Sequence, residues 1–141
     1  MAGQKINDLF CWEIDFEGIR VFMGSTNNGL AMTGIGFISE EDSIAYFAKR
    51  LPAANTIRDY SRNRVSAQAI ETLLRGETPR VKPMLDITLT DFQMKVMESI
   101  SKIPFGATKT YGEIAAALGK AKGARAVGQA VGRNPVPIVF P

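Results

Sequence analysis

Histidine is absent from this 141-residue chain, and cysteine occurs once, at Cys11. A single cysteine excludes an intramolecular disulfide and favours a reducing compartment. With no histidine and one thiol, the usual ligands of a structural zinc ion are missing, so we expect no metal site. The same shortage leaves no histidine to activate a cysteine nucleophile within these residues.

Long hydrophobic runs are missing as well. No apolar stretch approaches the roughly 18 residues that a membrane-spanning helix needs, so we expect no contact with a membrane. The first ten residues lack the apolar centre of a secretion signal. We therefore expect a protein of the cytoplasm, or of the nucleus if the source is eukaryotic.

Charge is distributed unevenly along the chain. The net charge is +3, but residues 1–89 hold 10 basic and 11 acidic residues, whereas residues 90–141 hold 7 basic and 3 acidic residues. A basic half beside a near-neutral half is typical of a nucleic-acid-binding surface. An ordinary solvated surface can show the same counts, so charge alone leaves both interpretations open.

The first part of the chain is rich in predicted strands. Residues 9–38 predict three of them, joined by turns at Glu17-Gly18 and Asn28-Gly29. Cys11 falls inside the predicted sheet. We expect it to be a buried structural thiol, because free cysteine is among the most buried residue types.

Two helices follow in the prediction. Ser39 is the expected N-cap of the first, which Pro52 ends, and the second covers residues 66–76. Residues 53–64 predict a loop or a short helical turn, and residues 84–89 a short strand. The predicted loop carries three arginines, Arg58, Arg62 and Arg64. They form either a phosphate-facing patch or a solvated loop.

Helix signals dominate the second part. Thr90 and Gln93 fit a capping box, in which two side chains satisfy the first backbone groups of a helix, and this helix should reach about Lys102. Thr110 and Glu113 fit a second capping box. A helix to about residue 119, a turn with glycine and a helix over residues 124–133 then give a helix-turn-helix pattern.

The last predicted helix has an unusual composition. Its apolar stripe is formed by Ala124, Val127 and Val131. Its other positions are mostly small, namely Ala126, Gly128, Ala130 and Gly132. Small residues allow close approach to another surface, which is either a neighbouring helix or a ligand. Arg125 points away from the apolar stripe. Residues 136–140 then predict an apolar strand in the core.

These residues resemble the DNA-binding half of the O6-alkylguanine-DNA alkyltransferases, also called methylated-DNA–protein-cysteine methyltransferases. The matching residues are Phe92-Gln93, Ile103-Pro104-Phe105-Gly106, Thr108, Tyr111-Gly112-Glu113-Ile114-Ala115, Ala124-Arg125-Ala126-Val127-Gly128, Asn134-Pro135-Val136-Pro137-Ile138 and Pro141. The resemblance is strong from about Thr90 to Pro141 and loose before that.

The resemblance implies a mixed α/β fold. A strand-rich, ribonuclease-H-like domain would cover residues 1–89, and a winged helix-turn-helix-type DNA-binding domain would cover residues 90–141. The implied activity is DNA repair by a methyltransferase. A protein of this family would bind double-stranded DNA, flip out an O6-alkylguanine and transfer the alkyl group irreversibly to its own cysteine. The family uses no cofactor, and we expect a monomer.

The resemblance also assigns roles to individual residues. Arg125 matches the arginine that enters the base stack in place of the flipped base. Tyr111 matches the tyrosine that presses on the adjacent phosphate. Asn134 matches a residue that braces the turn into the active-site strand, although it also suits a simple turn before Pro135. The implied DNA-binding residues are Tyr111, Gly112, Arg125, Ala126 and Gly128.

The sequence departs from the family pattern at its end. In the family, the closing proline is followed at once by the reactive cysteine and then by histidine and arginine, whereas the printed residues end at Pro141. No catalytic residue is therefore assigned here. We expect an alkyltransferase that is truncated, cleaved or only partly represented.

Two other interpretations stay open. The chain is alternatively a non-catalytic alkyltransferase-like protein that binds alkylated DNA, and the residue after Pro141 separates this from the first interpretation. It is otherwise a helix-turn-helix regulator that reads a specific sequence through base contacts. Arg125 is flanked only by alanines, which argues against such a regulator.

Overall fold

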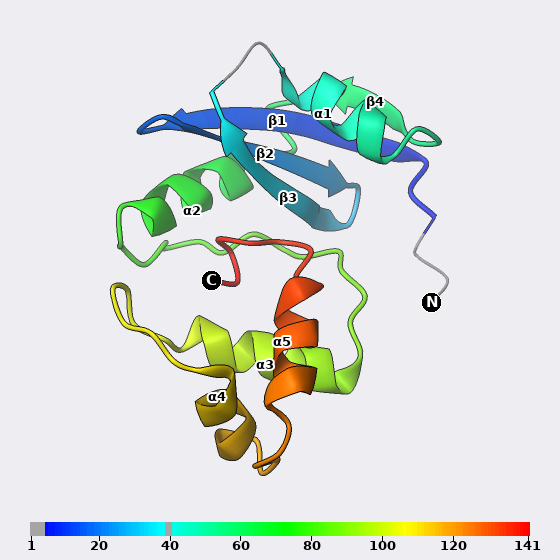
Figure 1. Ribbon diagram of the computed structural model, residues 1–141. Coiled ribbons are helices and arrows are strands. Elements are labelled where there is room, and N and C mark those ends of the chain that lie inside the picture. The colour runs from blue at the N-terminus through cyan, green and yellow to red at the C-terminus, as the bar shows by residue number, and fades with distance from the viewer. Residues whose placement is uncertain (1–4, 39–40) are drawn as a thin grey trace. The chain divides into compact units, whose positions relative to one another are not determined.

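The chain forms two units (Figure 1). Each unit has its own core of buried residues. The computed structural model describes residues 5–38 and 41–141. Unit 1 (Met1–Thr88) is rich in strands, and unit 2 (Leu89–Pro141) is helical. The predicted mixed α/β class is therefore confirmed. Among the described residues, no helix combines the length and the apolar character needed to span a membrane.

A four-stranded sheet is the centre of unit 1. Its strands are β1 (Asp8–Phe16), β2 (Ile19–Thr26), β3 (Gly29–Phe37) and β4 (Asn55–Arg58), in the order β3-β2-β1-β4. The first three strands are antiparallel neighbours, as predicted, and β4 runs parallel to β1. Gly18 takes a positive φ of 87° in the first turn, which glycine adopts without steric cost.

The prediction of a loop over residues 53–64 was wrong, because β4 lies inside it. Its four residues, Asn-Thr-Ile-Arg, show no alternating apolar pattern. The strand pairs along one edge of β1, from Asp8 with Asn55 to Cys11 with Arg58. Such pairing between distant segments leaves little trace in local sequence.

Helices α1 (Ser43–Arg50) and α2 (Arg64–Leu74) lie on opposite faces of the sheet (Figure 1). The N-cap of α1 is Asp42, whose carboxylate accepts a hydrogen bond of 2.8 Å from the Ala45 N–H. The prediction of Ser39 as the cap was wrong, and Ser39 itself lies outside the described residues. Phe47 of α1 packs with Leu9, Cys11 and Phe22 in the core.

The segment after α2 does not form the strand predicted at residues 84–89. It makes one isolated bridge, between Leu30 and Leu85. The Leu30 N–H donates to the Met84 carbonyl at 2.8 Å, and the Asp86 N–H donates to the Leu30 carbonyl at 2.8 Å. A Cβ atom at Gly29 would lie 2.5 Å from the Met84 carbonyl oxygen, so this crossing requires glycine.

Unit 2 consists of α3 (Asp91–Ser101), α4 (Tyr111–Ala117) and α5 (Ala124–Gly132). Both predicted capping boxes are confirmed, at Thr90 and at Thr110. The buried residues that join the three helices are Val96, Met97, Ile100, Ile114, Ala115, Val127 and Ala130. Two short helices with a tight turn thus rest on a third.

The tail after α5 is irregular, and the prediction of a strand at residues 136–140 was wrong. Only one bridge, between Pro137 and Phe140, is present there. Pro135 and Pro137 lack the N–H groups that a strand needs, and Ile138 takes a positive φ of 79°. Val136 is nevertheless fully buried.

Candidate nucleic-acid interface

Tyr111 is the first residue of α4, and the capping box fixes its backbone. The Thr110 hydroxyl accepts from the Glu113 N–H at 3.1 Å, and the Glu113 carboxylate accepts from the Thr110 N–H at 2.9 Å. The Tyr111 side chain is 50% exposed. A large aromatic group is therefore held at a defined point on the surface of unit 2.

Helix α5 presents an inner and an outer face. Val127 and Ala130 are buried against α3 and α4, which matches their spacing of three residues. Arg125 and Ala126 are exposed. Within the described residues, the Arg125 guanidinium takes part in no ion pair within 4.0 Å, so its donors face solvent.

The glycines of this region have different surroundings. A Cβ atom at Gly128 would lie 3.1 Å from both Cδ2 and Cε2 of Tyr111, so the tyrosine ring rests on α5 at this point. A Cβ atom at Gly132 would meet no heavy atom within 4 Å, and one at Gly112 would meet only the Thr110 hydroxyl, at 3.8 Å. The sequence indicated small residues on α5, but it did not indicate the contact between Gly128 and Tyr111.

Asn134 holds the tail that follows α5. Its Oδ1 accepts from the Val136 N–H at 3.0 Å, and its Nδ2 donates to the Phe140 carbonyl at 2.8 Å. One side chain therefore bonds to both ends of the bend around Ile138. The bond to Phe140 had no signal in the sequence, because it depends on the way the chain folds back.

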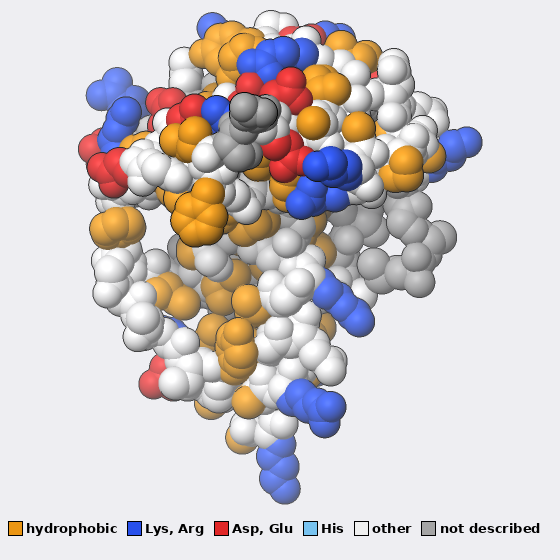
Figure 2. Space-filling model, turned by 45° about the horizontal axis from the view of Figure 1, so that its top comes forward, with side chains coloured by type: hydrophobic (Ala, Val, Ile, Leu, Met, Phe, Trp, Pro, Cys, Tyr) orange, Lys and Arg blue, Asp and Glu red, His pale blue; other side chains and the backbone are white. Residues whose placement is uncertain are grey.

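Basic side chains surround the exposed ends of these helices. Lys109, Lys120, Lys122, Arg125 and Arg133 are all exposed. Lys120 Nζ lies 4.7 Å from the centre of the Phe92 ring, a cation–π contact that leaves the ammonium group partly free. Figure 2 shows basic side chains standing apart from acidic ones on unit 2. The site thus combines positive charge, a fixed aromatic ring and small residues.

Arginines in unit 1 are engaged differently. Arg58 lies 2.6 Å from the Glu13 carboxylate and 4.3 Å from the centre of the Trp12 ring. Arg62 lies 3.0 Å from the Asp59 carboxylate and stacks on another aromatic ring of β1. Because both guanidinium groups have partners inside unit 1, they favour the structural interpretation of this cluster over a phosphate-facing patch.

Cys11 is fully buried, as predicted. Burial is the main reason that the pKa of its thiol rises to about 11. Since the thiolate is the reactive form, very little of Cys11 is nucleophilic near neutral pH. Cys11 is thus a packing residue of the sheet and does not belong to the interface on unit 2.

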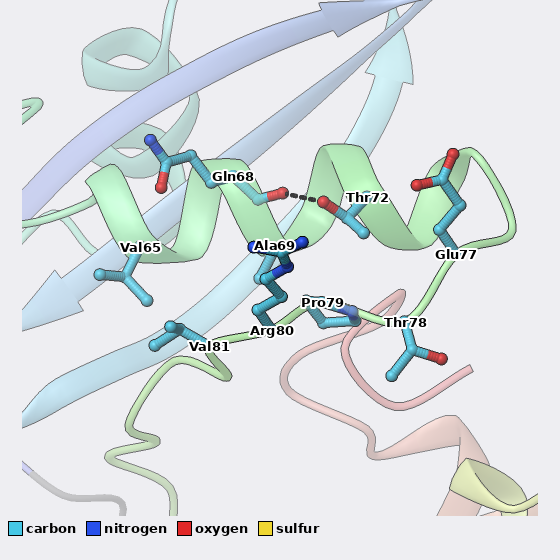
Figure 3. A pocket seen from close by; sticks show the side chains of 9 residues that line it. All are labelled: Val65, Gln68, Ala69, Thr72, Glu77, Thr78, Pro79, Arg80 and Val81. Carbon is cyan, nitrogen blue, oxygen red and sulfur yellow. Dashed lines mark hydrogen bonds between the residues drawn. The ribbon is translucent and has the colours of Figure 1, made fainter.

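A shallow hollow on unit 1 lies between α2 and the segment that follows it (Figure 3). It is lined by Val65, Gln68, Ala69, Thr72, Glu77, Thr78, Pro79, Arg80 and Val81. The Thr72 hydroxyl donates to the Gln68 carbonyl of its own helix at 2.8 Å. None of the predicted site residues lies in this hollow, so we do not assign it to the site.

Comparison with known proteins identifies the domain that carries this geometry. Residues 91–141 match the family model of the DNA-binding domain of 6-O-methylguanine DNA methyltransferase. This match covers nearly all of unit 2, including the capping box at Thr110, Arg125 and Asn134.

Curated relatives extend the match into unit 1. The inducible methylated-DNA–protein-cysteine methyltransferase of Bacillus subtilis is 31% identical over 126 residues, covering 89% of this chain and 70% of the relative. The constitutive enzyme of the same organism is 36% identical over 106 residues, covering 74% of this chain and 62% of the relative.

Solved structures show the same arrangement of elements. The O6-methylguanine methyltransferase of Mycobacterium tuberculosis matches with a TM-score of 0.70 and 26% identity, covering 94% of this chain and 75% of that one. A structure of the mycobacterial protein in complex with DNA matches with a TM-score of 0.67, covering 95% and 74%. This chain therefore belongs to the methylated-DNA–protein-cysteine methyltransferase family.

Proposed function

We propose that this protein repairs O6-alkylguanine in double-stranded DNA by transferring the alkyl group to a cysteine. The observation that carries the proposal is the match of residues 91–141 to the DNA-binding domain of the family, over the unit that presents unpaired basic side chains. The bacterial relatives and the DNA substrate support an action in the cytoplasm.

Recognition begins at the phosphates. The exposed lysines and arginines of unit 2 attract the DNA backbone and release its counterions, which supplies affinity without sequence preference. Tyr111 and Gly112, at the start of α4, approach the backbone beside the lesion. The small surface of Ala126 and Gly128 lets α5 approach a groove closely. A repair protein has to accept any flanking sequence, and such contacts meet that need.

Base flipping is the costly step. The O6-alkyl group lies within the base stack, and extruding the nucleotide costs a few kcal/mol. Arg125 stands exposed on α5 with its donors free, so it can fill the gap and bond to the orphaned base. Tyr111 constrains the neighbouring phosphate, and Asn134 keeps the tail in the shape that leads toward the alkyl acceptor.

Alkyl transfer requires a reactive thiolate, and Cys11 does not supply one, because burial raises its pKa to about 11. We therefore propose that residues 1–141 perform recognition and flipping, and that a cysteine outside them accepts the alkyl group. In this step the thiolate sulfur forms a bond to the alkyl carbon, and the carbon–O6 bond breaks. The electron pair stays on the guanine, which then takes up a proton.

Two measurements test this function. The first is the affinity for two matched duplexes, measured by fluorescence anisotropy. One duplex has an O6-methylguanine, and the other has a guanine at the same position. We expect tighter binding to the lesion and little dependence on flanking sequence. Equal affinity for both duplexes, or strong preference for one flanking sequence, would contradict the proposal and favour a sequence-reading regulator.

The second measurement is the intact mass of the protein purified from its source, before and after incubation with O6-benzylguanine. Gain of one benzyl group, mapped to a cysteine other than Cys11, is the expected result. Lesion binding without any gain in mass would indicate an alkyltransferase-like protein that recognises damage without repairing it. A benzyl group on Cys11 would overturn the structural role that we assign to this thiol.

A further inference from the structure

The Tyr111 ring rests directly on the backbone of α5 at Gly128. A Cβ atom at position 128 would lie 3.1 Å from Cδ2 and Cε2 of the ring and 3.8 Å from Cζ. Carbon atoms in ordinary contact are about 3.5–4.0 Å apart, so an added methyl group would force the ring to move. Because Gly128 has no side chain, the ring can occupy this place.

We propose that Gly128 is a positioning residue for Tyr111, and that its small size serves the ring as well as the approach to DNA. This inference rests on the proposed function, in which Tyr111 contacts the DNA backbone. Gly128 and Tyr111 are 17 positions apart and on different helices. Their contact therefore links the orientation of the ring to the placement of α5.

Two independent restraints then act on Tyr111. The capping box between Thr110 and Glu113 fixes the backbone at the start of α4. Contact with Gly128 limits the ring on one side, while 50% of the side chain stays exposed. An aromatic group that is oriented before DNA arrives loses less conformational freedom on binding, which favours affinity.

The other glycines of the region show that this contact is specific. Gly132 is also on α5, yet a Cβ atom there would meet nothing within 4 Å. Glycine is disfavoured in a helix relative to alanine, so each glycine needs a reason. The Tyr111 ring supplies that reason at Gly128 and leaves Gly132 as a matched control with the same chemical change.

The test is a double-mutant cycle on lesion binding. Gly128→Ala should weaken the affinity for a duplex with O6-methylguanine about three- to tenfold, because the ring moves, and Gly132→Ala should change it less than about twofold. In a Tyr111→Ala background, Gly128→Ala should lose the part of its effect that comes from the ring, so its penalty should be clearly smaller. An equal penalty in both backgrounds would overturn the proposal, since alanine would then clash with the DNA itself.

A measurement without DNA separates this inference from the proposed function. The ring-proton chemical shifts of Tyr111 in the free protein should change in Gly128→Ala and stay constant in Gly132→Ala. Unchanged ring signals in Gly128→Ala would overturn the contact, whatever the DNA result. Failure of the unaltered protein to distinguish lesion from guanine would instead overturn the proposed function and leave the contact standing.

Discussion

The two units treat their positive charges in different ways. All five ion pairs found among the described residues lie in unit 1, where they engage Arg20, Lys49, Arg58, Arg62 and Arg75. In unit 2, which is described throughout, no side chains approach closely enough to form one. Figure 2 shows this contrast, with acidic and basic groups adjacent on unit 1 and basic groups apart on unit 2.

Whether the basic side chains are paired matters more for DNA binding than the net charges of the two halves. When a basic side chain is paired with a carboxylate of its own unit, the negative charge of the carboxylate largely cancels its electric field. An unpaired cation on the surface attracts phosphate over about one Debye length, roughly 8 Å at physiological ionic strength. Unit 2 therefore has the charge of a nucleic-acid surface, whereas five of the ten basic residues of unit 1 are paired with carboxylates of the same unit.

Removing the unpaired Arg125 should produce the largest effect. We expect Arg125→Ala to slow alkyl transfer from a lesion duplex on the order of 100-fold, because a few kcal/mol of flipping cost would lose its compensation. Single-turnover kinetics with the protein purified from its source measures this. Arg133→Ala, a second exposed cation near the end of the same helix, is the control. Equal losses in both variants would show that charge alone matters.

The units also differ in how they hold irregular segments. In unit 1, backbone bonds to Leu30 hold residues 84–86, and the Thr26 hydroxyl donates to the Asp86 carboxylate. In unit 2, two bonds from the side chain of Asn134 close the bend of the tail, together with one backbone bond, in which the Phe140 N–H donates to the Val136 carbonyl at 3.1 Å. A single substitution should therefore disrupt the tail more easily than the segment in unit 1.

Asn134→Ala should lower the free energy of unfolding by roughly 2–3 kcal/mol, because it leaves the Val136 N–H and the Phe140 carbonyl without their partner. Asn134→Asp keeps the acceptor for the Val136 N–H but places a carboxylate oxygen against the Phe140 carbonyl, so it should cost at least as much. Denaturant titration of both variants gives the comparison. An unchanged midpoint in Asn134→Ala would show that water replaces both bonds.

Local rules predicted the parts of the fold that local groups determine. The capping boxes at Thr90 and Thr110 were confirmed because each joins a side chain and a backbone group within four residues. Strand β4 was missed because its partner strand, β1, lies far away in sequence. The prediction of a strand in the tail failed because it considered only the apolar residues. The prolines of the tail lack the N–H donors that a strand needs.

In the candidate site, too, the sequence predicted the features that depend on local sequence and missed the contacts between distant segments. The sequence indicated that Arg125 is exposed and that Val127 faces the core, because helix periodicity determines both. It did not indicate that Asn134 reaches Phe140, or that the Tyr111 ring lies on Gly128. Those contacts arise only after α4, α5 and the tail have packed on one another.

The buried thiol gives unit 1 a pH dependence of its own. The pKa of Cys11 is about 11 in the fold against an ordinary value of 9.0, so folding favours the neutral thiol. Its contribution to stability is complete below pH 9 and is lost as the pH rises through 11. We expect a loss on the order of 2 kcal/mol across this interval.

The comparison of the protein with a Cys11→Ala variant isolates this effect, since all other titratable groups are the same in both. The difference between their free energies of unfolding should shrink between pH 9 and pH 11, as the unaltered protein loses its advantage. A difference that stays constant across this interval would show that the thiol is ionised as easily in the fold as in the unfolded chain.

We expect the smallest effects when a single basic residue is replaced by alanine, either an unpaired one in unit 2 or a paired one in unit 1. Lys122→Ala, in the turn before α5, should weaken DNA binding several-fold at low salt. It should also reduce the slope of log K against log[salt] by about 0.9, the value for one lost phosphate contact. Salt titration of the affinity, by fluorescence anisotropy on a lesion duplex, measures this slope.

Arg62→Ala is the matched control in unit 1, and it should leave that slope unchanged and the affinity within about twofold. The pKa of its partner Asp59 is held low first by a hydrogen bond from the Ser61 hydroxyl, and then by the Arg62 N–H and guanidinium. Asp59 therefore stays ionised without Arg62, and unit 1 becomes more negative near the end of β4. If Arg62→Ala weakened DNA binding as much as Lys122→Ala does, the charges of both units would contribute to DNA affinity. The proposed difference between paired and unpaired cations would then be wrong.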